Sequence, residues 1–138
     1  MAARLDALIL CDFAQVREGL LFVQSGGLTR LMTRKLPGTF NCHVAMLVAV
    51  SPDVALDEHN VVMRIKHAPS ATALATVKVD LHPPSSTGGL MPGESRIVPV
   101  VVPLSTITFR AEGVHDLQVS IDDHLAGDLS FHVSVPAG

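Results

Sequence analysis

Two stretches near the end of the chain alternate apolar and polar side chains residue by residue. In residues 114–122 and 128–135, the odd positions are mostly Leu, Val, Ile and Phe, and the even positions are mostly Asp, Gln, Ser and His. The polar segment Asp122-Asp123-His124 joins the two stretches. Successive side chains of a β-strand point to opposite faces of a sheet, so this period of two predicts a β-hairpin that buries one face.

Strands are predicted along most of the remaining chain. Apolar, β-branched runs are separated by Gly and Pro signals, and no long helical period is present. Further strands are expected at residues 4–13, 18–24, 28–31, 39–50, 59–67, 72–81 and 95–103, with extended structure continuing to residue 109. Because Pro99 cannot donate a backbone hydrogen bond, residues 95–103 are expected to form an edge strand or to contain a bulge. Residues 13–18 could instead form one turn of helix.

Seven to nine short strands predict an all-β fold, an antiparallel β-sandwich of the immunoglobulin-like or jelly-roll-like kind. An open barrel is the alternative architecture. A chain of 138 residues has the usual size of one domain, so residues 1–138 are expected to share a single core. Residues 82–94 are rich in Pro, Gly and Ser and lack periodicity, which predicts a flexible loop.

Two of the predicted strands carry apolar residues on both faces. Leu8 and Leu10 fall on the nominally polar face of residues 4–13, and Ala45 and Leu47 do the same in residues 39–50. Such strands are expected to be central, or to have their second face covered by a loop or another subunit. The whole chain is 48% apolar and only 17% charged. We therefore expect a homo-oligomer, or a complex with another protein, that uses these four side chains.

Other partners are disfavoured by the composition. The net charge of −3 comes from charges scattered along the chain, which argues against nucleic acid. No apolar run approaches the roughly eighteen residues needed to span a membrane. Asp6 interrupts the short apolar start, which therefore lacks the form of a lipoprotein signal. Cys11 and Cys42 lie in apolar runs without a CxxC or zinc spacing, so we expect two buried free thiols in the cytoplasm.

Seven histidines raise the question of a metal site. They are His43, His59, His67, His82, His115, His124 and His132. No HxH, HExxH or paired HxxxH spacing occurs, so a zinc site would need ligands assembled by tertiary structure alone. Scattered surface histidines and no cofactor are the favoured interpretation. If a metal binds, the first candidates are His115, Asp122, Asp123 and His124 around the last hairpin.

No catalytic constellation is visible in the sequence. A GxSxG motif is absent, and Asp12 beside Cys11 opposes formation of a thiolate. Asp12, Arg17 and Glu18 are expected to pair locally around the first turn, or alternatively to form a patch for a partner. The favoured function is therefore a non-enzymatic structural or protein-interaction module.

Two other functions remain open. The first is a binder of a small apolar ligand held between the sheets, with Met46 and Met63 in the lining of its cavity. The second and least supported is a metal-dependent hydrolase that uses the histidines.

The segments RLDALILCDFAQVREGLLFVQSGGLTRL, GVHDLQVSIDD and LSFHVSV resemble a family of short, uncharacterised, mostly actinobacterial all-β proteins, a domain of unknown function. The likeness spans most of the chain, and CDFAQVREGLLFVQSGG is its most distinctive part. The resemblance implies a bacterial protein and carries no activity with it. His115 stands where many sandwich families have Tyr, so any corner hydrogen bond there is expected to come from imidazole.

Overall fold

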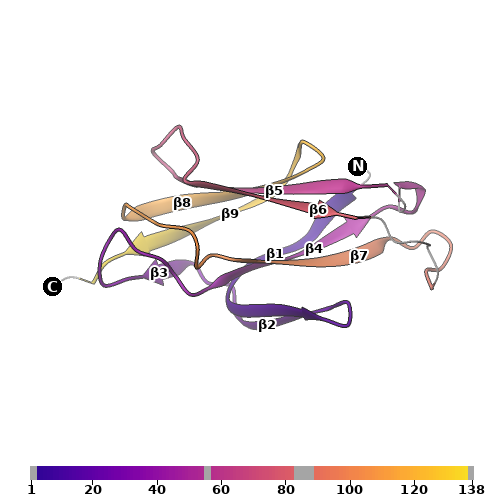
Figure 1. The fold of residues 1–138 in the computed structure, drawn as a ribbon, viewed down its shortest axis with the longest axis horizontal. Coiled ribbons are helices and arrows are strands. Elements are labelled where there is room, and N and C mark those ends of the chain that lie inside the picture. The colour runs from indigo at the N-terminus through magenta and orange to yellow at the C-terminus, as the bar shows by residue number, and fades with distance from the viewer. Residues whose placement is uncertain (1–2, 55–56, 83–88, 137–138) are drawn as a thin grey trace.

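The computed structural model describes residues 3–54, 57–82 and 89–136 and consists of two curled β-sheets (Figure 1). The strands are β1 (Ala3–Arg17), β2 (Leu20–Gly26), β3 (Arg30–Met32), β4 (His43–Val50), β5 (His59–His67), β6 (Ala75–Leu81), β7 (Arg96–Pro103), β8 (Gly113–Ile121) and β9 (His124–Ser134). One sheet has the order β2-β1-β4-β7 and the other β3-β9-β8-β5-β6. The predicted all-β, two-sheet fold is confirmed, and each sheet curls into a half-barrel.

Most predicted strands are present, with a few corrections. Residues 13–17 continue β1 as a strand, so the alternative of a helical turn is wrong. Residues 104–112 form no regular strand, although Phe109 makes an isolated bridge to Gly38. Strand β3 pairs with β9 in parallel, so the fold is mostly rather than wholly antiparallel. The only helical element among the described residues is a single 3₁₀ turn, Pro52–Val54.

The predicted flexible loop at residues 82–94 is described only in part. Residues 83–88 lie outside the described residues. Residues 89–94 form turns, in which the backbone amide of Met91 donates to a Glu94 carboxylate oxygen at 2.8 Å. Among the described residues, no helix is long and apolar enough to cross a membrane.

The core lies between the two sheets and follows the predicted alternation. In β4, Val44, Met46 and Val48 point into it, and in β5 Met63 and Ile65 do the same. The core faces of β8 and β9 were also predicted correctly. Phe109 forms its aromatic centre, with edge-to-face contacts to Phe40, His115 and Phe131. Burial of these side chains is the main source of stability of the fold.

The inward face of β1 changes partway along the strand. Leu5 pairs with Val48, but Ala7 pairs with Leu47, so one extra residue is inserted between them. This β-bulge moves the core-facing positions from odd to even numbers. Leu8 and Leu10 consequently face the core, which corrects their predicted place on the outer face.

The four-stranded sheet curls so far that its own hairpin covers part of its outer face. Cys11, Ala14 and Ala45 form a second buried cluster there, with Leu21 of β2 and Val101 of β7 packed against it. The outer face of β4 was predicted to be covered, and around Ala45 other residues of the same chain cover it. A second subunit is not needed at this point.

Candidate functional site

The hairpin formed by β1 and β2 extends beyond the body of the sandwich. Its turn consists of Glu18 and Gly19, with φ angles of 52° and 74°. Two consecutive residues with positive φ are typical of the type I′ turn, whose twist matches that of paired strands. The register places Arg17 opposite Leu20 and Gln15 opposite Phe22. The hairpin therefore presents two faces and an open edge along β2, and β1 is also unpaired on its other side beyond Cys11.

The hairpin exposes an unusual amount of apolar surface. Five of the ten large apolar side chains exposed in the described residues belong to it, with exposed fractions between 39% and 64%. They are Phe13, Val16, Leu20, Phe22 and Val23. These side chains lie on both faces of the hairpin and together leave on the order of 400 Å² of apolar surface in water. We call these five side chains and the edge of β2 the hairpin surface.

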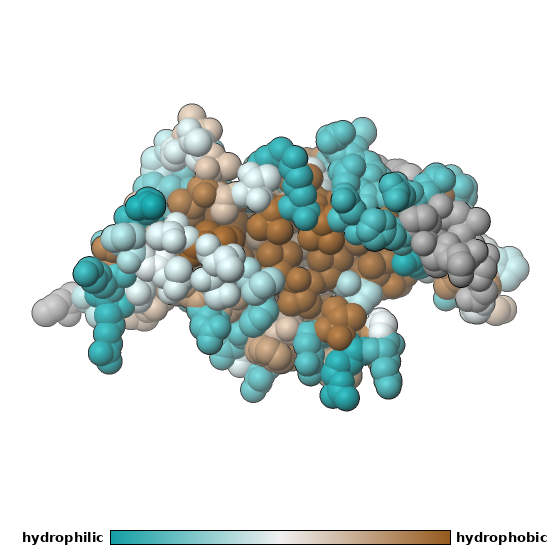
Figure 2. Space-filling view, in the orientation of Figure 1, coloured by the Kyte–Doolittle hydropathy of each residue, from teal (hydrophilic) through white to brown (hydrophobic). Residues whose placement is uncertain are grey.

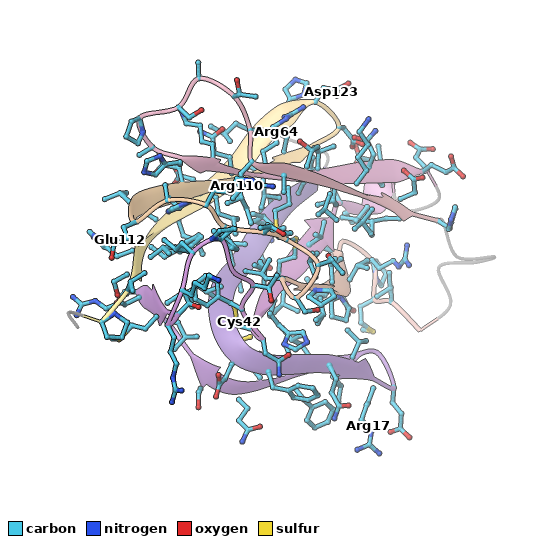
Figure 3. All side chains as sticks on the ribbon, turned by 60° about the vertical axis from the view of Figure 1, so that its left-hand side comes forward. Arg17, Cys42, Arg64, Arg110, Glu112 and Asp123 are labelled. Carbon is cyan, nitrogen blue, oxygen red and sulfur yellow. The ribbon has the colours of Figure 1, made fainter. Side chains whose placement is uncertain are left out.

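The charged residues of the hairpin do not pair with one another in the way the sequence predicts. The guanidinium carbon of Arg17 lies 5.9 Å from the centroid of the Phe22 ring, which is a cation–π contact. No salt bridge joins Asp12, Arg17 and Glu18 in the described structure. Figure 3 shows Arg17 at the end of the hairpin, far from Asp123 at the opposite side of the molecule. The charges thus border the apolar surface instead of forming a local cluster.

The free edge of β2 lacks the charges and prolines that protect other edges, although Ser25 near its end has a φ of 53° and interrupts the regular strand. The sheets end in four edge strands, β2, β7, β3 and β6. Strand β7 contains Pro99 and Pro103, β6 contains Lys78 and Asp80, and β3 is only three residues long. Strand β2 is seven residues long and has neither a charge nor a proline, and all its residues except Leu21 are exposed. Such an edge is a template for pairing with another strand.

The sequence-based interface candidates lie apart from the hairpin surface. Leu10 and Ala45 are 1% and 0% exposed, so neither offers surface to a partner. Leu8 is half-buried against the core, and Leu47 is half-buried on the outer face. The β-bulge in β1 and the curl of the sheet account for this correction, because both bury positions that alternation alone assigns to the surface.

Apolar surface is also visible along the side of the molecule where β6 and β7 lie. Figure 2 shows it gathered over β7 and between β7 and β6. Val77 and Val79 of β6 and Val98 of β7 are only half-buried against the core. Strand β6 carries charges and strand β7 carries prolines, so the edges of these two strands are less suited to pairing with another strand than the edge of β2.

A buried histidine and a carboxylate join distant parts of the chain near the last turn. His59 is 6% exposed, and its Nδ1 lies 2.6 Å from Asp122 Oδ2, while its Nε2 lies 3.1 Å from the Val54 carbonyl oxygen. Asp122 Oδ1 also accepts from the Asn60 amide at 3.0 Å. Carbonyl and carboxylate oxygens only accept hydrogen bonds, so both ring nitrogens carry a proton and His59 is an imidazolium.

The pKa values of this pair agree with that assignment. Burial alone would lower the pKa of His59, but the hydrogen bonds to Asp122 and Val54 outweigh it and raise the pKa. Burial would raise the pKa of Asp122, but the hydrogen bonds from His59 and Asn60 lower it. Both ring nitrogens of His59 are engaged, so the pair serves as a structural link and has no free lone pair to act as a base.

His115 lies at the opposite end of β8 from this turn. It is 1% exposed, stacks on Phe131 at 5.7 Å between ring centroids, and donates from Nδ1 to the Gly113 carbonyl at 3.1 Å. Burial lowers the pKa of the His115 imidazole and so disfavours its charged form. The interval from position 115 to position 122 spans about 23 Å of strand, so the predicted proximity of His115 to Asp122 is wrong.

The other predicted metal ligands are likewise not gathered around a common point. His124 Nδ1 contacts the backbone oxygen of Asp122, and the Asp122 carboxylate is occupied by His59 and Asn60. Asp123 lies on the rim of a shallow polar hollow of about 280 Å³ with Arg64 and Lys78. In residues 3–54, 57–82 and 89–136 no three His, Cys, Asp or Glu side chains are grouped so as to hold a metal ion.

Both cysteines are buried and unpaired. Burial, followed by the proximity of Cys11 and Asp12, raises the pKa of Cys42 to about 11. Burial and then Asp12 raise the pKa of Cys11, whose thiol donates to the His43 carbonyl oxygen at 3.4 Å. Neither thiol is placed to act as a nucleophile near neutral pH.

An apolar hollow of about 530 Å³ lies on the side of the sandwich where β1 meets β9. Its lining consists of Leu8, Ile9, Leu10, Gly26, Gly27, Leu28, Thr29, Leu129 and Ser130. The hollow is shallow and open to solvent. It does not involve Met46 or Met63, which are at most 1% exposed and fill the core instead of lining a cavity.

A comparison with models of protein families matches residues 6–134 to a family of unknown function, DUF6941. The chain belongs to DUF6941. This confirms the family resemblance noted from the sequence, and residues 11–27, its most distinctive segment, contain the hairpin surface. No curated protein matches this DUF6941 chain.

Solved structures share the fold of this DUF6941 chain at low sequence identity. The alkylpurine DNA glycosylase AlkC of Pseudomonas fluorescens, bound to DNA containing an abasic site analog, aligns with a TM-score of 0.56 and 10% identity. The alignment covers 97% of this chain but 31% of the glycosylase, so the chain spans about a third of that protein. A Listeria innocua β-glucosidase in complex with gluconolactone aligns with a TM-score of 0.47 and 12% identity, over 96% of this chain and 16% of the enzyme. Of these two likenesses, the one to the glycosylase shows a shared fold and nothing more.

Sequence reasoning missed the hairpin surface of DUF6941 but had a signal for it. The segment LLFVQSG contains no charge and no proline, and it follows a Glu-Gly pair suited to a tight turn. What could not be read from the sequence is that β2 lies at an edge, because strand order depends on distant pairing.

Proposed function

We propose that this DUF6941 chain is a non-enzymatic protein-interaction module that binds through the hairpin surface. The observation that carries the proposal is the edge of β2, which is exposed, carries no charge or proline, and lies among five exposed apolar side chains. An extended segment of a partner can add to such an edge through backbone hydrogen bonds, while the apolar side chains on both faces supply the burial.

The histidines and cysteines support a non-enzymatic role. His59 and His115 are each held in a structural hydrogen bond, and the pKa values of both thiols are raised. The two free thiols favour a reducing compartment such as the cytoplasm.

The test is photo-cross-linking in cells that produce the chain, with a photoreactive amino acid at position 20 or, in a matched control, at position 125. Leu20 and Leu125 are similarly exposed, at 64% and 60%, but Leu125 lies on β9 away from the hairpin. We expect a discrete protein adduct from position 20 and none from position 125. Equal labelling from both positions, or none from position 20, would contradict the proposal.

The apolar hollow beside β1 and β9 favours binding of a small apolar ligand as a second candidate function. Its lining is mostly Leu and Gly, which suits an aliphatic group. Titration with a fluorescent fatty acid tests it. Saturable binding that is lost in a Thr29→Phe variant, shown by circular dichroism to be folded, would support this function, while binding that is absent or unchanged in the variant would exclude it at this hollow.

A further inference from the structure

We infer that the segment that pairs with β2 is β2 of a second copy of the chain, antiparallel to the first across a two-fold axis. This inference rests on the proposed function and names its partner. Such pairing would join the two four-stranded sheets into one continuous sheet with β2 next to β2 at its centre.

The charge distribution of the edge suits a symmetric pairing. A two-fold axis through the middle of β2 brings residues near Val23 opposite their own copies, and like charges placed opposite one another in a sheet are destabilising. Strand β2 has no charged residue, so no like charges meet. The charged residues of the hairpin, Asp12, Arg17 and Glu18, lie on β1 or in the turn, so none of them is on the strand that the axis crosses.

The exposed area also agrees with what a stable dimer needs. A standard interface buries about 800 Å² per partner, of which somewhat more than half is apolar, or on the order of 450 Å². The five apolar side chains of the hairpin surface expose on the order of 400 Å². Burial of both faces of the hairpin would therefore supply about the apolar area that one partner contributes.

The absence of charge favours a second copy over an unrelated protein. Interfaces between different proteins commonly use complementary charges to steer association and to exclude wrong partners. Homodimer interfaces are more apolar, and their symmetry alone fixes the pairing. An edge made of Leu, Phe, Val, Gln, Ser and Gly fits the second description.

The experiment measures solution mass by light scattering on a size-exclusion column over a dilution series. The wild-type chain of 14.6 kDa is compared with two single variants, Phe22→Glu on β2 and Ile97→Glu on β7. Phe22 and Ile97 are 47% and 46% exposed and lie on the two opposite edge strands of one sheet, so they form a matched pair. Glutamate at position 22 also has Arg17 beside it, which helps that variant to fold.

We expect twice the chain mass for the wild type and for Ile97→Glu, and a dissociation constant raised roughly thirtyfold or more in Phe22→Glu, as for a central interface residue. A monomer at every concentration, together with a position-20 adduct to a different protein in cells, would overturn the second-copy inference but leave the proposed function standing. A dimer that Phe22→Glu does not weaken, with circular dichroism showing that the variant is folded, would overturn the inference. If, in addition, photo-cross-linking from position 20 gave no adduct to any protein, the proposed function would also be contradicted.

Discussion

His59 and Asp122 are 63 positions apart, yet their side chains meet at 2.6 Å and connect the start of β5 to the turn between β8 and β9. The same imidazole reaches the carbonyl oxygen of Val54 at 3.1 Å, so three segments converge on one ring. Asp122 has a φ of 50° in this turn, a conformation that Asp and Asn tolerate better than most residues. The pair therefore fixes one end of the five-stranded sheet.

The pair is expected to make stability depend on pH in both directions. The pKa of His59 is raised from 6.5, so its contribution is fully present below pH 6.5 and is lost as the pH rises through the raised value. The pKa of Asp122 is lowered from 3.8, so its contribution is present above pH 3.8 and is lost as the pH falls through the lowered value. The pair thus stabilises the folded state most between pH 3.8 and pH 6.5, where both contributions are fully present.

Replacement of Asp122 by Asn tests this account because Asn keeps the turn conformation and removes the charge. We expect Asp122→Asn to lower the free energy of unfolding by about 1–2 kcal/mol near pH 5, measured by urea denaturation. The difference from the wild type should shrink above neutral pH as His59 loses its proton. A difference that is constant from pH 5 to pH 9 would show that His59 is not charged.

His115 is expected to affect the pH dependence of stability in the opposite sense to His59. Its pKa is lowered by burial, so the unfolded chain takes up a proton first and stability falls as the pH falls below 6.5. A His115→Phe variant should lack this component, so its stability relative to the wild type should improve between pH 6.5 and pH 5. An unchanged difference between the two proteins over that interval would mean that the His115 ring is not buried as described.

The aromatic centre of the core is expected to dominate stability. Phe109 is 0% exposed and contacts Phe40, His115 and Phe131. Phe109→Ala should cost roughly 3–5 kcal/mol, the usual loss for a buried Phe. In contrast, Ile97→Ala, at a half-exposed position on β7, should change the free energy of unfolding by only about 0.5 kcal/mol. Comparable losses for both variants would contradict the assigned core.

Both thiols are expected to be unreactive in the folded protein. Burial of both side chains and the pKa of Cys42 of about 11 leave little thiolate at pH 8. Ellman's reagent should therefore label neither cysteine in the native protein and both in urea. Rapid labelling of one thiol without denaturant would indicate a reactive cysteine, and with it a possible catalytic role.

The sequence predicted the core faces of β4, β5, β8 and β9 because strict alternation survives wherever a strand is regular. From Pro99 it also predicted either an edge strand or a bulge, and β7 is an edge. Prediction failed in β1, where one extra residue between Leu5 and Ala7 reverses the faces. No residue type in that segment marks such a bulge, since neither Gly nor Pro is present there.

The site was harder to predict than the fold for a related reason. Leu10 and Ala45 were assigned to an interface from their apolar character, but the bulge turns Leu10 inward and the curled hairpin covers Ala45. The exposed apolar side chains lie instead on β1 and β2 near the turn. Recognising them requires knowledge of which strand ends the sheet, and pairing between distant segments determines that order.

The most direct test of the claim that the hairpin surface joins two copies is the fluorescence of a Phe22→Trp variant. The chain has no Trp of its own, so the emission reports position 22 alone. We predict blue-shifted emission that resists acrylamide quenching at high protein concentration, and a shift to solvent-exposed emission on dilution. The Ile97→Trp control should remain exposed throughout. Emission from position 22 that matches the control at every concentration would contradict the account.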